Sequence, residues 1–177
     1  MDFGKMPLYF IPNHGQVDAR VAYYLQGKDK TIYFTSEGLT YVLSERNAGE
    51  EGAERKLQNG SSQGRFAVKL DFVGANRDVR PSGEEKTGVV MSYFKGKPEE
   101  WKTGLPTYSR IVYKDLWPGN HAAYYGTVDK MKYEFVVHPG SDPSLIRLAY
   151  RGASAVEVNA EGRLEVKTPA GDFADDR

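Results

Sequence analysis

Residues 65–72 read RFAVKLDF, and this stretch decides the fold class that the sequence predicts. Large apolar side chains recur at every second position, which is the spacing at which the side chains of a β-strand point to the same face. One face of this strand would therefore lie in a core, and the other would meet solvent. The apolar face would carry Phe66, Val68, Leu70 and Phe72.

The same alternation recurs along the chain, whereas helix signals are poor. Only KPEEWKTG, residues 97–104, could form a helical turn, because Pro comes early, acidic residues follow and Gly comes last. Further strand candidates are rich in Val, Ile, Tyr, Phe and Thr. About a dozen short strands separated by turn residues predict an all-β fold, an antiparallel β-sandwich. The further strand candidates are residues 31–34, 40–43, 107–113, 122–126, 130–137, 145–151, 155–158 and 163–168.

A chain of 177 residues is long enough for one domain with a core of its own, so we expect residues 1–177 to form a single β-sandwich domain. Two polar segments interrupt the strand pattern. Residues 44–64 contain one large apolar residue, Leu57, and residues 76–88 form a shorter charged segment. We expect both to be mobile polar loops.

Composition excludes several classes of function. Lys and Arg together number 24, as do Asp and Glu, so the chain lacks the excess positive charge that broad nucleic-acid binding needs. There is no Cys, which excludes disulfides and thiolate chemistry. No apolar run approaches the ~20 residues of a membrane-spanning helix. We expect no cofactor, no nucleic acid and no membrane span.

The polar residues of FIPNHGQVDARVAYY, residues 10–24, could be a catalytic cluster or a turn. The turn is the better interpretation, because Asn13 and Gly15 tolerate turn dihedrals and Pro12 favours extended geometry in Ile11. Asp18 would cap backbone N–H groups of the next turn.

An internal echo supports this interpretation. Residues 15–43 and 140–168 both run from Gly through Asp to a strand that ends at Gly, and then to two strands joined by a Glu-Gly turn. The echo is either a pseudo-repeat or convergent turn chemistry.

No catalytic or metal site is evident from the sequence. His14, His121 and His138 lie far apart, so a histidine metal site would need the fold to gather them. No nucleophile motif is present, and the adjacent carboxylates lie mostly in expected loops. We therefore expect a protein that is not an enzyme and binds no metal.

Aromatic residues are the best candidates for binding. The chain has 12 Tyr, 8 Phe and 2 Trp, and exposed rings of this kind can stack on sugars. The candidate ligand-binding residues are Trp101, Trp117 and Tyr108. Buried tryptophans would argue against this hypothesis. A hydrolase is a weaker third hypothesis, which would need a deep pocket with two facing carboxylates or a His beside a Ser.

The chain resembles the N-terminal domain of bacterial SBBP-repeat surface proteins. The resemblance begins in residues 7–27, with a Phe-x-x-Asn-x-Gly-Gln element, and resumes in residues 89–126. It continues through residues 133–153 and 161–173, and so covers nearly all of the chain except the two polar loops. The chain departs at His14, where Gln or Arg is more usual, and at NHAAYYG, residues 120–126, where the pattern usually runs GIDLVYYG.

The resemblance implies a domain that precedes β-propeller-type repeats in a longer secreted or cell-surface protein, with no catalytic role to assign to any residue. We therefore expect an extracellular or cell-surface module for surface architecture, adhesion or partner recognition. Its partners would be the downstream repeats of the same chain, and glycans or surface proteins. A carbohydrate-binding module is the alternative.

Overall fold

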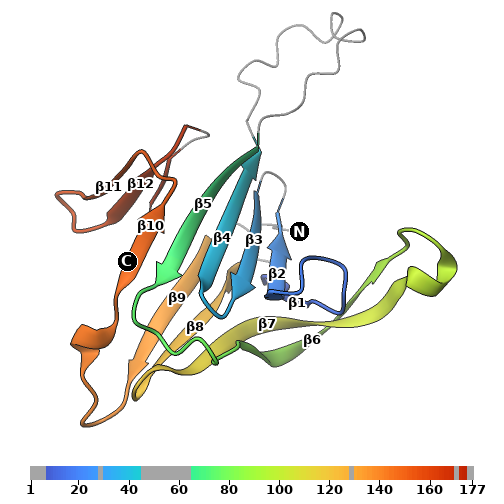
Figure 1. The fold of residues 1–177 in the computed structure, drawn as a ribbon, viewed down its shortest axis with the longest axis horizontal. Coiled ribbons are helices and arrows are strands. Elements are labelled where there is room, and N and C mark those ends of the chain that lie inside the picture. Colours follow the sequence, from blue (N-terminus) through green and yellow to red (C-terminus); the bar gives the residue numbers. More distant parts are fainter. Residues whose placement is uncertain (1–6, 28–29, 45–64, 128–129, 170–171, 175–177) are drawn as a thin grey trace, which may run out of the picture.

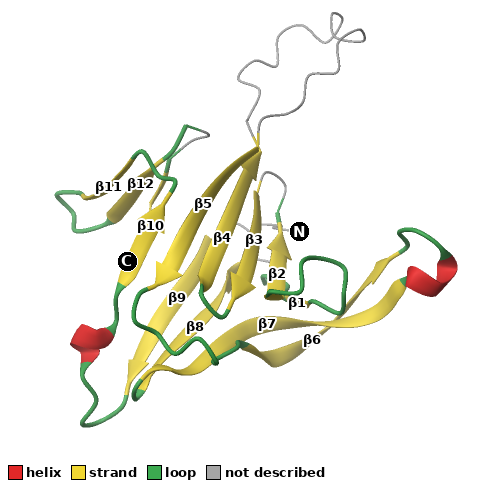
Figure 2. Ribbon diagram, in the orientation of Figure 1, coloured by secondary structure: helices red, strands yellow, loops and turns green. Residues whose placement is uncertain are grey.

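The computed structural model describes residues 7–27, 30–44, 65–127, 130–169 and 172–174, and it is all-β (Figures 1 and 2). The predicted fold class is therefore confirmed. Two single turns of 3-10 helix, Pro98–Glu100 and Pro143–Leu145, accompany the strands, and the first lies where the sequence predicted a helical turn. The strands are β1 Ile11–Pro12, β2 Val21–Gln26, β3 Lys30–Thr35, β4 Gly38–Ser44, β5 Arg65–Phe72, β6 Ser82–Tyr93, β7 Lys102–Trp117, β8 Asn120–Thr127, β9 Lys130–Val137, β10 Leu148–Arg151, β11 Ala155–Val158, β12 Leu164–Lys167 and β13 Phe173–Ala174.

The strands form three antiparallel sheets. A six-stranded sheet has the order β1-β2-β3-β4-β5-β10, a four-stranded sheet has the order β6-β7-β8-β9, and a small sheet has the order β11-β12-β13. The two larger sheets lie one behind the other (Figure 1). Their facing side chains form one core, as the alternation in β5 predicted, because Val68, Leu70 and Phe72 are all buried. The four-stranded sheet contributes Ile111, Tyr113, Leu116, Trp117 and Tyr124 to the buried set.

The β6–β7 hairpin extends beyond the sandwich (Figure 1). Its proximal half belongs to the four-stranded sheet, where β7 pairs with β8. Further along, Leu105 of β7 joins a second buried cluster with Ile11, Val21 and Tyr24. The hairpin is therefore attached to the six-stranded sheet by apolar contacts before its tip projects away.

The prediction of a loop over residues 76–88 is wrong for residues 82–88, because β6 begins at Ser82. The polar side chains of this edge strand face solvent, while its backbone pairs with β7. Gly83 also allows the ring of Tyr108 to lie directly over it, since a Cβ at this position would stand 2.6 Å from the ring. Of the other predicted loop, residues 45–64 lie outside the described residues, and Ser44 ends β4.

The internal echo holds for the order of strands but not for their pairing. Strands β2, β3 and β4 form one continuous meander, whereas β10 pairs with β5 while β11 and β12 belong to the small sheet. The two Glu-Gly turns also differ in length, because Thr35 pairs with Gly38 but Val158 pairs with Leu164. In the described part of the chain, no helix is long and apolar enough to cross a membrane.

Candidate functional site

The polar segment at residues 13–20 is a turn, as the sequence predicted, and Asn13 organises it. The Asn13 side-chain nitrogen donates to the backbone oxygens of Val17, Asp18 and Val21 at 3.3, 2.8 and 2.9 Å. Its side-chain oxygen accepts from the backbone N–H groups of Gly15 and Val17 at 3.0 and 3.2 Å. These bonds satisfy backbone groups that a tight turn would otherwise leave without partners, so the role of Asn13 is structural.

Asp18 caps the end of this turn. Its carboxylate accepts from the backbone N–H of Arg20 at 2.9 Å and from the Arg20 guanidinium at 3.0 and 2.9 Å. The Arg20 guanidinium, and then the Arg20 backbone N–H, hold the pKa of Asp18 far below its usual value. Asp18 therefore stays ionised, and it orients Arg20.

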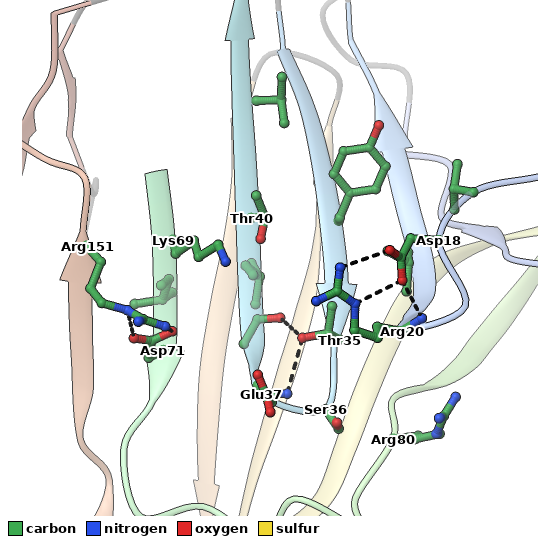
Figure 3. Close-up of a pocket in the computed structure, with 17 residues that line it drawn as sticks. Asp18, Arg20, Thr35, Ser36, Glu37, Thr40, Lys69, Asp71, Arg80 and Arg151 are labelled. Atoms are coloured by element: carbon green, nitrogen blue, oxygen red, sulfur yellow. Dashed lines mark hydrogen bonds and ion pairs between the residues drawn. The ribbon is translucent and has the colours of Figure 1, made fainter. Parts of the chain in front are cut away.

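Asp18 and Arg20 also line a hollow of about 430 Å³ on the outer face of the six-stranded sheet (Figure 3). We call it the outer-face hollow. Figure 3 shows Lys69, Asp71 and Arg151 on one side of it and Asp18 and Arg20 on the other. The remaining residues that line it are Val17, Val21, Tyr33, Thr35, Ser36, Glu37, Gly38, Leu39, Thr40, Val42, Leu70 and Arg80.

The structure places Trp117, one of the predicted ligand-binding residues, in the core of the sandwich. Its side chain is 1% exposed and packs edge to face on Phe72 and Phe135. Its indole N–H donates to the backbone oxygen of Val73 at 2.9 Å. The ring is part of the core that the two larger sheets share.

Tyr108 is half-buried, and its ring packs edge to face on Tyr23 with 6.0 Å between ring centroids. Trp101, by contrast, is 42% exposed and lies at the tip of the β6–β7 hairpin. The structure therefore does not gather the three predicted residues. Trp101 directly precedes β7, Tyr108 lies within this strand, and Trp117 ends it.

Phe94, the partner of Trp101, was not among the residues predicted from the sequence. Phe94 is 66% exposed, and its ring meets the Trp101 ring edge to face at 5.1 Å. The Trp101 indole N–H points at the backbone oxygen of Gly96 at 3.4 Å, and the Glu100 carboxylate accepts from the Lys97 N–H at 3.0 Å. We call Phe94 and Trp101 the aromatic tip. In the sequence, the signal for this pair was that Phe94 and Trp101 lie on either side of a turn that contains Gly96.

The fold brings together two histidines that the sequence left apart. The register of β8 and β9 places the Nε2 atoms of His121 and His138 2.8 Å from each other. The backbone N–H of Asp115 donates to Nδ1 of His121 at 2.7 Å, so neutral His121 carries its proton on Nε2 and donates it to His138. In this tautomer, Nε2 of His121 is the donor of the pair and Nε2 of His138 is the acceptor. Among the described residues, no group of three His, Cys, Asp or Glu could hold a metal ion.

Carboxylates from two strands meet at Arg110, on the outer face of the four-stranded sheet. Arg110 lies 2.5 Å from Glu134 and 3.7 Å from Glu84, and its guanidinium stacks over the ring of Tyr125 at 5.1 Å. The hydrogen bond that Arg110 donates to Glu134 contributes most to raising the pKa of Arg110. A pair of carboxylates held by one arginine is an ion-pair network of the sheet surface.

The fold and these surfaces define an antiparallel β-sandwich domain with a projecting aromatic hairpin. The chain belongs to the family described as "Domain of unknown function (DUF7948)", whose model matches residues 10–177. The comparisons with curated proteins and with solved structures gave no match.

Proposed function

We propose that the domain is a non-catalytic module of a bacterial cell-surface or secreted repeat protein, which serves in surface architecture, adhesion or partner recognition. The aromatic tip is the observation that carries this proposal. It places two exposed rings, Phe94 and Trp101, at the end of a hairpin that projects from the sandwich (Figure 1). Exposed aromatic residues on an ordered support are typical of interaction surfaces.

The ion pairs of the two sheets support a non-catalytic role. General acid–base catalysis needs a group that can exchange its proton with a substrate within hydrogen-bond reach. Glu84 and Glu134 instead share Arg110, and Asp71 is bound by Arg151 at 2.8 Å. Each of these carboxylates is therefore paired with an arginine. This supports a structural task for them.

The resemblance to SBBP-repeat surface proteins supports the proposed location and the proposed partner. In such proteins the domain precedes β-propeller-type repeats. The downstream repeats of the same chain are therefore the first partner to test, and surface proteins are the second.

Carbohydrate binding at Trp101 is the alternative, and the exposure of this ring favours it. The Phe94 ring contacts Trp101 at an interplanar angle of 88°. It therefore supports one orientation of the indole, whose exposed area could stack on a sugar ring. Tyr108 and Trp117 lie elsewhere, so sugar binding at this site would depend on the aromatic tip.

A glycan array, probed with and without calcium, combined with tryptophan fluorescence tests carbohydrate binding at the aromatic tip. Trp117 is buried, so a ligand at the aromatic tip should change the emission of Trp101. In the variant Trp101→Phe, Trp117 is the one remaining tryptophan and serves as the matched reference. A glycan that shifts the emission of the parent protein but not of Trp101→Phe would establish the alternative.

Binding to isolated cell envelopes tests the first proposal. We expect labelled protein to bind, and the double substitution Phe94→Ala and Trp101→Ala to abolish binding while the unfolding midpoint stays the same. Equal binding by the double variant would overturn the role of the aromatic tip.

A further inference from the structure

Positive charge without a partner lines the outer-face hollow. All three of its carboxylates face an arginine, whereas two of its cations, Lys69 and Arg80, have no side-chain partner within the described residues. Arg80 lies in the segment that leads into β6, apart from Lys69 of β5 (Figure 3). A ligand that spans the hollow and carries more than one acidic group could therefore meet both cations. The carboxylate pairs are Asp18 with Arg20 at 2.9 Å, Asp71 with Arg151 at 2.8 Å and Glu37 with Arg77 at 3.8 Å.

The register of the sheet places Lys69 where its charge is unfavourable. Lys69 of β5 lies directly opposite Arg151 of β10. Like charges at directly opposite positions on neighbouring strands destabilise a sheet. Arg151 reaches diagonally to Asp71, but Lys69 has Thr40 on its other side, which carries no charge. A bound anion beside Lys69 would supply the missing countercharge.

The floor of the hollow offers hydroxyl groups and an aromatic ring. Tyr33 and Thr40 lie opposite each other in β3 and β4, and both line the hollow. Within the described residues, neither of their hydroxyl groups has a hydrogen-bond partner. Thr35, by comparison, is already engaged, because its hydroxyl donates to Gly38 and accepts from the Glu37 N–H. The available groups suit sugar hydroxyls and the apolar face of a sugar ring.

We propose that the outer-face hollow binds an acidic saccharide. Lys69 and Arg80 would bind its carboxylate or sulfate groups, and Thr40 and Tyr33 would bind its hydroxyl groups. The volume of about 430 Å³ lies within the range of small-ligand sites, so a few sugar residues fill it. The site is separate from the aromatic tip, and this proposal does not depend on sugar binding by Trp101.

An array of uronate-, sialate- and sulfate-bearing glycans, each printed beside its neutral counterpart, tests the ligand class. The affinities for trigalacturonic acid and for its methyl ester, each measured by titration, isolate the effect of charge, because the two ligands share the same sugar chain. We expect acidic members to bind more tightly than their neutral counterparts, and the affinity to fall as salt rises. Equal binding of both forms, or no binding of any acidic member, would overturn the proposal.

Substitutions locate the site. Lys69→Gln and Arg80→Gln should each weaken binding of the best acidic glycan about tenfold, because each removes a charge-assisted hydrogen bond. Lys86→Gln is the matched control, since Lys86 is exposed on β6 of the other sheet. Trp101→Ala should leave this binding unchanged. An equal loss with Lys86→Gln, or tighter binding of a polyglutamate peptide than of any acidic glycan, would overturn the assignment.

Discussion

Phe10 and Tyr108 exchange two backbone hydrogen bonds, from Phe10 N to Tyr108 O at 2.8 Å and from Tyr108 N to Phe10 O at 3.1 Å. Tyr108 belongs to β7 of the four-stranded sheet, while the residues directly after Phe10 form β1 of the six-stranded sheet. The N-terminal segment therefore joins the two sheets at one edge. The Phe10 ring is fully buried and packs edge to face on Phe34 at 5.5 Å.

Phe10→Ala should lower the free energy of unfolding by about 3–5 kcal/mol, because it leaves a cavity at this junction. Phe94→Ala is the matched control, since the Phe94 ring is 66% exposed, and its cost should stay within about 1 kcal/mol. Chemical denaturation of both variants gives the comparison. Similar midpoints for the two would contradict the assigned role of Phe10.

Asn13→Ala should destabilise the domain by about 2 kcal/mol, because several backbone groups of the turn lose their hydrogen-bond partner. The neighbour His14 is exposed, so His14→Ala should change stability by less than about 0.5 kcal/mol. Thermal unfolding measures both. If His14→Ala proved the more costly substitution, the polar segment would have a role other than turn formation.

Gly15→Ala and Gly38→Ala should differ in cost. Gly15 has a φ of 102°, but a Cβ there would meet only the Lys102 side chain at 3.7 Å, so the backbone strain costs about 1 kcal/mol or more. A Cβ on Gly38 would stand 1.9 Å from the backbone oxygen of Leu70, which the sheet holds in place. Gly38→Ala should therefore cost roughly 3 kcal/mol or more. Urea unfolding measures both costs. If Gly15→Ala proved more destabilising than Gly38→Ala, this reasoning would be refuted.

Trp117→Phe should lower stability by about 2 kcal/mol, because it leaves a small cavity and removes the hydrogen bond to the Val73 oxygen. Trp101→Phe should cost less than about 0.5 kcal/mol. Acrylamide quenching checks the same assignment by a second route. In the Trp101→Phe variant all tryptophan emission comes from Trp117, so acrylamide should quench it only weakly. Efficient quenching would mean that Trp117 is accessible to solvent.

Asp18 should contribute to stability at neutral pH and less in acid. Its pKa is lowered in the folded protein relative to the ordinary value of 3.8, so the unfolded chain binds this proton first as the pH falls. The contribution is complete above about pH 5 and declines as the pH drops below about 4. The difference in Tm between the parent protein and Asp18→Asn should therefore become smaller as the pH falls below about 4. Arg20→Gln, which removes the other partner of this ion pair, should show the same narrowing. A difference that stays constant with pH would contradict the assignment.

The local features of this fold could be predicted from the sequence. Side chains along a strand alternate between two faces, so the pattern of residues 65–72 was enough to predict β5 and its buried face. Turn chemistry is local as well. Asn13, Gly15 and Asp18 act within a few residues of their own positions, and the turn they form was predicted correctly.

The pairing of strands was decided only by the tertiary structure, because it depends on contacts between residues distant in sequence. The polar composition of residues 82–88 concealed an edge strand, whose partner β7 carries the buried side chains. Trp101 and Trp117 have the same chemistry, and only their packing in the fold determines that Trp117 is buried between Phe72 of β5 and Phe135 of β9. Lys69 lies beside Arg151 because β10 pairs with β5. Asp71, which is the diagonal partner of Arg151, precedes Arg151 by 80 residues in the chain. Alternation along a strand fixes which face a side chain takes, whereas the neighbouring strand decides what it meets there.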